Sequence, residues 1–353
     1  MRMAKLHIGV IGCGAIAKTH VDAWRKAGAK VVSICDSNVY LAKSRAFAWR
    51  VPRWYEDVST MIEHEDLNAV SICTPPNVRL SVFKPVAETG VHAVVEKPFA
   101  ITFQEACEMS KLAKKYGTKV SVVHSWVFSY IMRKIMKYLG NDYVGDIASI
   151  NLTMLHTRND PMVADPSHWS HRIQAGRFGE SLPHPIYTFY RILGKIQVKC
   201  IYGVKMAKRE WMPIDELKVL FENDKHQIAT AHISFNSARP ETTLNILGTD
   251  GILCANLTNN VLLKKRGRNI SPISIGLDNL RIIWDTVASS IDIMAAIALK
   301  RYEGMHTEFI KRFVKSIVDD IELPVTDEEA LNVVKTYEEV TQRIHSSYYE
   351  KAV

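Results

Sequence analysis

The chain has 353 residues, more than the roughly 250–300 residues that one hydrophobic core usually organises, so we expect two domains. Hydrophobic residues make up 47% and charged residues 23%, a balance that excludes disordered, collagen-like and membrane proteins and predicts a soluble, folded chain. The formal net charge of +8 is compatible with an anionic cofactor or substrate. The sequence contains no stripe of basic residues interleaved with aromatic residues, so nucleic-acid binding is not expected.

The cysteines and the N-terminus indicate the compartment. The six cysteines are widely spaced and form no C-x-x-C pair, which argues against a disulfide framework or a structural zinc site. The first apolar segment contains glycines and lacks the small-residue cleavage site of a secretory signal. No apolar stretch reaches the roughly 18 residues of a membrane-spanning helix. We therefore expect a cytoplasmic protein without a membrane span.

Residues 1–125 alternate short β-branched runs with helical patterns, which is typical of a parallel sheet covered by helices. The expected strands are Leu6–Ile11, Val31–Cys35, Arg53–Tyr55, Ala69–Cys73, Ala93–Val95 and Val120–Val123. The expected helices are Ala15–Lys26, Val39–Trp49, a segment after Asp57, Val78–Glu88 and Phe103–Tyr116. Most of these strands are apolar on both faces, as buried parallel strands should be.

Residues 126–353 show a different pattern, in which longer runs are separated by turns and favour antiparallel strands. A linking helix is expected at Ser129–Tyr138. The expected strands are Ile147–Thr157, Val198–Met206, Leu217–Glu222, Gln227–Phe235, Thr242–Leu247, Gly251–Leu257 and Val261–Lys264. An apolar stripe from Phe309 to Val318 predicts a further helix that ends near Pro324.

Two segments of this second half allow more than one interpretation. The residues from Asn279 to Tyr302 form a helical pattern with little charge in its middle, for which a buried core helix is the simplest interpretation and a subunit interface the alternative. The basic cluster of Lys264, Lys265, Arg266 and Arg268 follows an apolar run and is expected to form an exposed hairpin end.

The first strand leads directly into Gly12-Cys13-Gly14-Ala15-Ile16-Ala17, a G-x-G-x-x-A pattern that opens the first helix. Gly12 permits the tight turn, Gly14 lets the backbone approach a pyrophosphate, and Ala17 lets the helix lie close to the sheet. We expect the loop from Gly12 to Ile16 to bind a dinucleotide at the helix N-terminus. Asp36 ends the second strand and can accept hydrogen bonds from the adenosine ribose, which favours NAD over NADP. Residues 1–125 are therefore expected to form an NAD-binding Rossmann domain.

Two later strands end on the same edge of the sheet, where open α/β folds bind their ligands. The first is followed by Thr74-Pro75-Pro76-Asn77, which either shapes the backbone beside the cofactor or is simply a rigid loop. The second is followed by Glu96-Lys97-Pro98, where Lys97 can donate to a substrate oxygen and Pro98 suggests a cis or strained turn. A surface ion pair between Glu96 and Lys97 is the alternative. The candidate cofactor contacts in these turns are Thr74, Pro75, Asn77, Glu96 and Lys97.

On these residues the chain resembles the Gfo/Idh/MocA oxidoreductase family, named for glucose-fructose oxidoreductase, inositol dehydrogenase and a rhizopine catabolism protein. The resemblance covers nearly the whole chain and also rests on Gly248-Thr249-Asp250-Gly251 and on the segment from Pro324 to Ala330. It implies a dehydrogenase or reductase that uses NAD, or less readily NADP, on a sugar, polyol or related compound. It also implies that residues 126–353 form an α+β domain with a large, predominantly antiparallel open sheet, which binds substrate and builds a homodimer or homotetramer.

The family usually carries a D-x-G-x-H segment that completes the active site together with the lysine. Here Glu180-Ser181-Leu182-Pro183-His184 occupies that place, so the histidine matches while Glu180 replaces aspartate and Leu182 replaces glycine. Tyr187 stands where an acidic residue often follows. The two prolines place the segment in a first helical turn, with Ser181 as a possible N-cap and a helix through Ile186–Leu193.

The resemblance implies three catalytic residues. Lys97 would hold the substrate oxygen, His184 would exchange its proton, and Glu180 would orient a neighbouring hydroxyl or the histidine. An imidazole suits proton exchange because its unperturbed pKa lies near 6.5. From the residues alone, a packed or capping histidine is the alternative for His184.

Four residues are candidate substrate contacts, namely His124, Trp126, Arg158 and Trp169. The two tryptophans could stack on a sugar ring, and the arginine could pair with a carboxylate or phosphate, although ordinary packing and surface charge are the alternatives. The nearby His168-x-x-His171 pattern does not have a diagnostic metal-ligand spacing, so no metal site is predicted.

Two other functions fit the same residues. One is a cofactor-binding sensor or assembly protein without turnover, against which the retained Lys97 and His184 argue. The other is an NAD-dependent glycosidase or epimerase-like enzyme that is redox-neutral overall. Product formed without net accumulation of NADH would indicate the second.

Overall fold

The computed structural model describes residues 6–266 and 271–350, and it divides the chain into two compact units. Unit 1 comprises the described residues up to Phe128 together with Gly304–Lys335. Unit 2 comprises the described residues of Ser129–Glu303 and those from Thr336 onward. The helix α12 (Asp327–Ile344) begins in unit 1 and ends in unit 2.

Within the described residues, unit 1 contains a six-stranded parallel sheet in the order β3-β2-β1-β4-β5-β6. The strands are β1 (His7–Ile11), β2 (Lys30–Cys35), β3 (Arg53–Tyr55), β4 (Ala69–Ile72), β5 (His92–Val95) and β6 (Val120–Val122). The helices between them are α1 (Ala17–Lys26), α2 (Val39–Trp49), α3 (Val58–His64), α4 (Arg79–Glu88) and α5 (Phe103–Tyr116). The predicted α/β alternation is confirmed, with element ends shifted by two residues at most. The strand order reverses between β1 and β4, and open α/β sheets bind their ligands in the crevice outside the carboxyl ends of the strands at such a point.

The segment Gly304–Lys335 packs into unit 1, whereas the predicted division placed everything after residue 125 in the second domain. Its helix α11 (Met305–Val318) lies against α1. The fully buried Phe313 meets Trp24 edge to face with ring centroids 6.2 Å apart, and Phe309 meets Phe128 at 5.3 Å. The apolar stripe of α11 was visible in the sequence, but the surface that it covers was not.

Unit 2 contains a seven-stranded sheet in the order β13-β12-β11-β7-β10-β9-β8, counted over the described residues. The strands are β7 (Ile147–Thr157), β8 (Ile196–Val204), β9 (Glu216–Asn223), β10 (Ile228–Ser237), β11 (Glu241–Gly248), β12 (Gly251–Asn256) and β13 (Val261–Arg266). All neighbours are antiparallel except β7 and β10, so the predicted antiparallel character is confirmed. The parallel pair arises because β7 inserts between β11 and β10, which a simple meander would not do.

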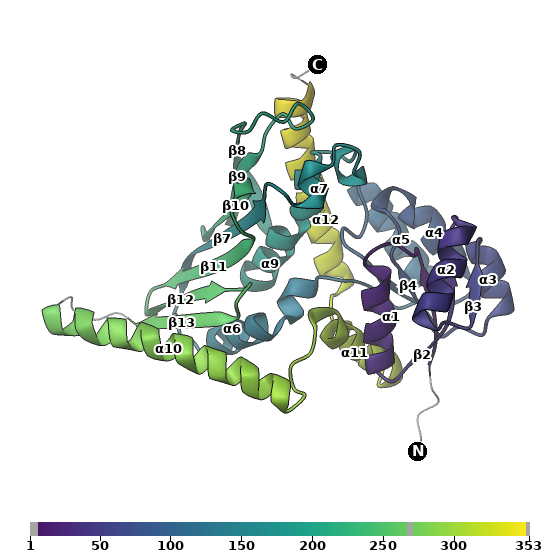
Figure 1. Ribbon diagram of the computed structural model, residues 1–353, viewed down its shortest axis with the longest axis horizontal. Coiled ribbons are helices and arrows are strands. Elements are labelled where there is room, and N and C mark those ends of the chain that lie inside the picture. Colours follow the sequence, from purple (N-terminus) through teal and green to yellow (C-terminus); the bar gives the residue numbers. More distant parts are fainter. Residues whose placement is uncertain (1–5, 267–270, 351–353) are drawn as a thin grey trace. The chain divides into compact units, whose positions relative to one another are not determined.

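One face of this sheet is covered and the other is polar. Along β7, Ile150 and Leu152 are buried, whereas Asn151 between them is exposed, as the two-residue period of a strand requires. The helix α9 (Pro183–Leu193) packs on the buried face, where Phe189 meets Phe221 of β9 at 5.7 Å. The remaining helices of unit 2 are α6 (Tyr130–Gly140), α7 (Pro161–Ala164), α8 (Arg177–Ser181) and α10 (Pro272–Ala298) (Figure 1).

The helix α10 lies along β13 at one edge of this sheet, and the prediction of a buried core helix is wrong. Most of its large apolar side chains are exposed, whereas Asp285 and Ser289 are buried. The polar face turns inward because its carboxylates find cations there, including Lys264 at 3.1 Å from Asp285. Lys264, Lys265 and Arg266 continue β13 and do not form a hairpin end, and Arg268 lies outside the described residues.

All six cysteines are free. None of the described helices combines the length and the apolar character that crossing a membrane requires.

Replacing Phe313 by Ala tests whether the segment Gly304–Lys335 belongs to the core of unit 1. The substitution should lower the free energy of unfolding by about 3–5 kcal/mol, because it leaves a cavity beside Trp24. Val318→Ala, at a 41% exposed position of the same helix, should change it by about 0.5 kcal/mol at most. Denaturant titration of the full chain measures both, and equal effects would contradict this placement.

Candidate functional site

The loop between β1 and α1 passes close to the end of β4. Gly12 has φ +88°, and a Cβ atom there would lie 2.9 Å from the carbonyl carbon of Cys73 and from the amide nitrogen of Thr74. Only glycine combines this backbone conformation with so close an approach. A Cβ atom at Gly14 would have no other atom within 4 Å, so the space beside the loop is open there. The predicted roles of the two glycines therefore fit the geometry.

Asp36 lies at the carboxyl end of β2 and is held by two backbone amides. Its Oδ2 accepts from the Cys13 N–H at 2.8 Å and its Oδ1 from the Asn38 N–H at 2.9 Å. A carboxylate has about four lone-pair sites, so acceptor capacity remains for ribose hydroxyls. Cys13 thus orients Asp36 through its backbone, while its buried thiol has a pKa raised to about 12 by burial and by the charge of Asp36.

Other features of this crevice also fit a dinucleotide. The helix α1 starts after Ile16 without any side-chain cap, which leaves its N-terminal amides to an anion, and Ala15 beside them is exposed. The hydroxyl of Thr74 is buried at the end of β4 and has no hydrogen-bond partner within the described structure. A buried polar atom of this kind calls for a partner. Pro75 and Asn77 are exposed in the 3₁₀ turn that follows.

A buried arginine that the sequence analysis missed joins two of the loops. The Arg79 guanidinium at the start of α4 is 3% exposed and donates to the Thr74 carbonyl at 2.9 and 3.1 Å. It also donates to the carbonyls of Glu96 and Pro98, and to that of Lys97 at 3.3 Å. The Lys97–Pro98 peptide bond is cis. Arg79 therefore fixes the backbone on both sides of the half-buried Lys97.

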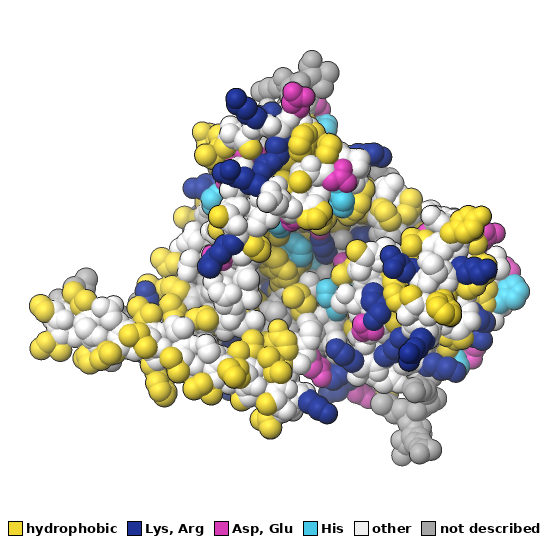
Figure 2. Space-filling model, viewed as in Figure 1, with side chains coloured by type: hydrophobic (Ala, Val, Ile, Leu, Met, Phe, Trp, Pro, Cys, Tyr) yellow, Lys and Arg dark blue, Asp and Glu magenta, His cyan; other side chains and the backbone are white. Residues whose placement is uncertain are grey.

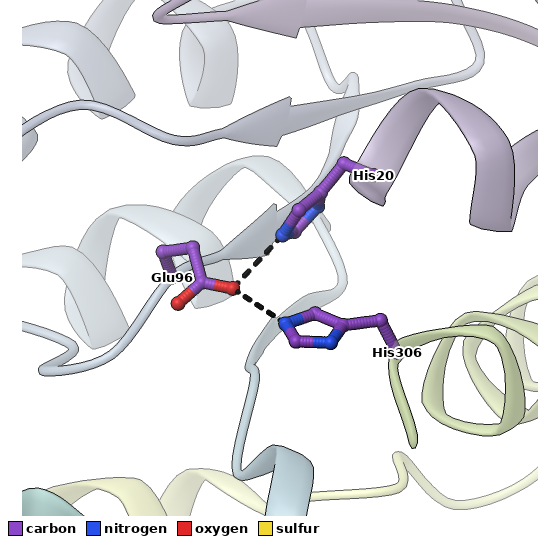
Figure 3. A group of neighbouring side chains, drawn as sticks. All are labelled: His20, Glu96 and His306. Carbon is purple, nitrogen blue, oxygen red and sulfur yellow. Dashed lines mark hydrogen bonds and ion pairs between the residues drawn. The ribbon is translucent and has the colours of Figure 1, made fainter. Parts of the chain in front are cut away.

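Glu96 is buried and does not form the predicted surface ion pair. Its Oε1 accepts from His20 Nε2 at 2.9 Å and from His306 Nε2 at 3.2 Å, as Figure 3 shows. Its Oε2 accepts from the Lys97 N–H at 3.1 Å. Burial alone would raise the pKa of Glu96, but the two imidazole donors hold it well below its usual range. The carboxylate thus stays charged and joins α1, β5 and α11.

The same three side chains form the one metal-compatible group that residues 6–266 and 271–350 contain, but their hydrogen bonds need no ion. The hydroxyl of Ser71 accepts from Trp24 Nε1 at 2.7 Å and lies 2.9 Å from His20 Nδ1. Burial lowers the pKa of His20, so the ring is neutral. Its single proton then sits on Nε2 facing Glu96, and Nδ1 accepts from Ser71. Every polar atom of His20 is thereby satisfied.

In unit 2, Glu180 lies on the short helix α8 and pairs with Arg177 of the same helix. Arg177 is 2% exposed, donates to the Ser181 hydroxyl at 2.8 Å and lies over the ring of Phe235 at 5.4 Å. The prediction of Ser181 as an N-cap is wrong, because α8 leads through Leu182 into α9 and Leu182 is the cap residue. Both prolines of the segment lie in the first turn of α9, as predicted.

His184 is half-buried in that first turn and is held by Tyr187. The His184 Nδ1 and the Tyr187 hydroxyl are 2.6 Å apart, and the two rings meet edge to face at 5.6 Å. Tyr187 is fully buried. Its hydroxyl therefore fixes the orientation of the imidazole, a role that a carboxylate can also fill.

Two histidines near Arg177 carry buried ring nitrogens without a partner within the described structure, His156 Nε2 and His171 Nε2. Burial and the charge of Arg177 lower the pKa of His156 to about 4, against the opposite effect of Asp160 at 3.4 Å. Burial and the charge of His168 lower the pKa of His171 as well. The sequence shows both histidines only as part of a polar stretch, because no local pattern indicates that their Nε2 atoms are buried.

The four predicted substrate contacts lie in different surroundings. In unit 1, His124 is buried with its Nδ1 2.8 Å from Glu329 Oε1, and Trp126 is half-buried in a 3₁₀ turn. In unit 2, Arg158 is exposed and donates to the Asn236 carbonyl at 3.3 Å, and Trp169 is 43% exposed.

Comparison with known proteins agrees with this fold and loop. A family model described as an oxidoreductase family with an NAD-binding Rossmann fold matches residues 6–124. D-apiose dehydrogenase of Paraburkholderia graminis is 28% identical over 137 residues, 38% of this chain and 36% of that protein. The uncharacterized oxidoreductase YrbE of Bacillus subtilis is 23% identical over 331 residues, 92% of this chain and 89% of that one.

The same architecture occurs in scyllo-inositol dehydrogenase from Lactobacillus casei, solved with bound NAD(H) and scyllo-inositol. Its TM-score is 0.77 at 16% identity, over 99% of this chain and 98% of that one, a likeness that concerns the fold. The parallel sheet, the glycine-rich loop after β1 and the carboxylate of Asp36 together define unit 1 as an NAD-binding oxidoreductase domain. The chain is thus similar to the Gfo/Idh/MocA oxidoreductases, whose family model matches residues 6–124. It spans about a third of the length of D-apiose dehydrogenase.

Two glycines with the same backbone conformation test the dinucleotide loop. Gly12→Ala should weaken NAD binding by at least about tenfold, because the added methyl group meets the backbone of Cys73. Gly28 has φ +89° but open space around its Cβ position, so Gly28→Ala bears the same conformational cost without the collision. Calorimetric titration with NAD measures both, and unchanged affinity in Gly12→Ala would rule out the proposed approach.

The half-buried His156 predicts a loss of stability in weak acid. In the unfolded chain a histidine takes up a proton near pH 6.5, whereas the folded protein resists it until about pH 4. The unfolded state therefore binds more protons between these values, and the free energy of unfolding falls as the pH falls through them, by up to about 3 kcal/mol.

Denaturant titrations at pH 7, 5.5 and 4 measure this loss. His156→Asn should flatten the profile, whereas His64→Asn, at an exposed residue, should leave it unchanged. A profile that is the same in His156→Asn as in the original protein would contradict the assignment.

Proposed function

We propose that the protein transfers a hydride between NAD and a hydroxyl- or carbonyl-bearing carbon of a sugar, polyol or sugar acid. The observation that carries the proposal is the juxtaposition, within unit 1, of the dinucleotide crevice and Lys97 at the end of the neighbouring strand β5. The names of the relatives support the substrate class, since D-apiose dehydrogenase and scyllo-inositol dehydrogenase are named for a sugar and a polyol.

Gly12, Gly14, Thr74 and Asp36 would hold the NAD, which supplies the hydride acceptor in oxidation and the donor in reduction. Asp36 favours NAD over NADP because a 2′-phosphate would meet its carboxylate, and the two amides that hold Asp36 prevent it from turning away.

Lys97 binds the reacting oxygen of the substrate through its ammonium group and stabilises negative charge there as the proton leaves. Its backbone is held by Arg79 from one side and by Glu96 from the other. Such fixation lets the ammonium group act without first being ordered.

His184 exchanges the proton of the substrate hydroxyl. To accept this proton at Nε2, the ring must carry its own proton on Nδ1, which then donates to the Tyr187 hydroxyl. Glu180, held by Arg177, orients a neighbouring substrate hydroxyl, and Arg158 and Trp169 are proposed to line the substrate. The assignment of Lys97, Glu180 and His184 to one reaction rests on the family resemblance.

We also propose a cytoplasmic location and a homodimer or homotetramer that forms through the sheet of unit 2. The free cysteines support a reducing compartment. The face of this sheet opposite α9 supports the interface, because it carries uncharged polar side chains such as Asn151, Thr153 and Thr230 at partly accessible positions.

Lys97→Met and His184→Asn should each lower turnover by at least about 100-fold while NAD still binds, since they remove the oxygen-binding cation and the proton acceptor. Absorbance of reduced nicotinamide across a panel of aldoses, polyols, sugar acids and inositols measures turnover. The matched controls are Lys84→Met and His226→Asn at exposed positions, which should retain it.

Each outcome of this panel is informative. Normal turnover in Lys97→Met or His184→Asn would remove that residue from the mechanism. NAD binding without turnover on any compound, or product formed without net NADH, would favour a sensor or a redox-neutral enzyme in place of a dehydrogenase.

A further inference from the structure

The helix α10 packs on unit 2 with its polar face and turns its apolar face outward. Asp285 accepts from the Lys264 N–H at 3.0 Å, and the Ser289 hydroxyl accepts from the Leu262 N–H at 3.3 Å. Asp292 binds Lys134 and accepts from the Tyr130 hydroxyl at 2.8 Å. A surface helix normally buries its apolar stripe. The opposite arrangement here leaves a stripe that its own unit does not cover.

The helix exposes further isoleucines, among them Ile283, but six large side chains, each between 44% and 69% exposed, follow one line along it. They are Leu277, Leu280, Trp284, Val287, Ile291 and Met294. Figure 2 shows the apolar side chains gathered along the helix. These six expose on the order of 700 Å², above the largest apolar patch of a typical monomer and close to what each partner of a standard interface buries.

The spacing of the stripe specifies what covers it. Successive members are three, four, three, four and three residues apart, which is the a/d pattern of a coiled coil. This period of 3.5 residues keeps a stripe facing a second helix along its whole length. A partner that offered a groove or a flat surface would not require this 3.5-residue period.

The charges favour a second copy of the same helix. No member of the stripe is charged, and the two aspartates nearest its centre are engaged on the inner face. Two copies can therefore meet without facing like charges. A lipid surface fits less well, because helices that lie on membranes usually line their polar face with lysine and arginine.

We propose that α10 pairs with α10 of a second copy of this chain, antiparallel about a twofold axis. In this arrangement each a position faces a d position. Trp284 then meets Val287 of the second copy, and Leu280 meets its Ile291, so a large side chain lies opposite a smaller one at the centre. The interface is isologous and closed, which is the commonest form of homodimer.

This inference rests on the homo-oligomer proposed above and adds α10 to the sheet of unit 2 as a second contact surface. The test distinguishes the α10 contact from the contact through the sheet, because an oligomer built only through the face of the sheet would survive substitutions in α10. It is independent of the proposed activity.

Sedimentation velocity of the full chain over a range of micromolar concentrations tests the pairing. The original protein should form a dimer or a larger even assembly. Leu280→Glu with Ile291→Glu should weaken the α10 contact by about 100-fold or more, because the carboxylates at positions 280 and 291 of the two copies would face one another within an apolar contact. Asn279→Glu with Thr286→Glu places the same charge on exposed positions beside the stripe and should leave association unchanged. Circular dichroism and NAD binding check that both variants fold.

Disulfide formation tests the orientation. Leu280→Cys with Ile291→Cys should crosslink two chains readily on oxidation, whereas Leu280→Cys alone should not, because the antiparallel pairing separates the two copies of position 280. Crosslinking of the single variant would overturn the antiparallel arrangement. A monomeric original protein, including one that binds anionic vesicles through α10, would overturn the pairing itself. So would an assembly that is unchanged in Leu280→Glu with Ile291→Glu.

Discussion

The carboxylate of Glu96 is removed from water at the end of β5, and a charge in that position is stable only where donors replace the solvent. His20 from α1, His306 from α11 and the backbone N–H of Lys97 provide them. The elements that carry these donors must therefore meet at this point. The position of Lys97 follows from the same requirement, since its own amide is one of the three donors.

Arg79 is a buried cation, which needs hydrogen-bond acceptors in place of water just as the carboxylate of Glu96 needs donors. Its guanidinium satisfies carbonyls from the turns after β4 and β5, which bear the diproline sequence and the proposed catalytic lysine. In unit 2, Arg177 likewise holds Glu180, and Tyr187 holds His184. The backbone of Lys97 and the side chains of Glu180 and His184 are thus each held by a polar group that is itself buried. Preorganised polar groups of this kind are what charge stabilisation in a reaction requires.

The helix α10 shows how the same electrostatics can oppose the usual burial of apolar surface. Its length and apolar character are evident from the residues, and such a helix is expected to bury its apolar side chains. Lys264 and Lys134 instead draw Asp285 and Asp292 inward, and the apolar stripe is left outside. The stripe retains a regular 3.5-residue period, which a helix exposed to water alone would not need.

The sequence alone determined the parallel and antiparallel halves and the glycine loop, because these depend on local period and on the backbone freedom of Gly12. It also predicted the cis or strained turn at Pro98. Only the tertiary structure decided that β7 lies beside β10, that α11 completes unit 1, and that His20 and Arg79 are buried. These outcomes depend on which distant groups satisfy one another's charges and hydrogen bonds, and no local pattern of residues encodes that choice.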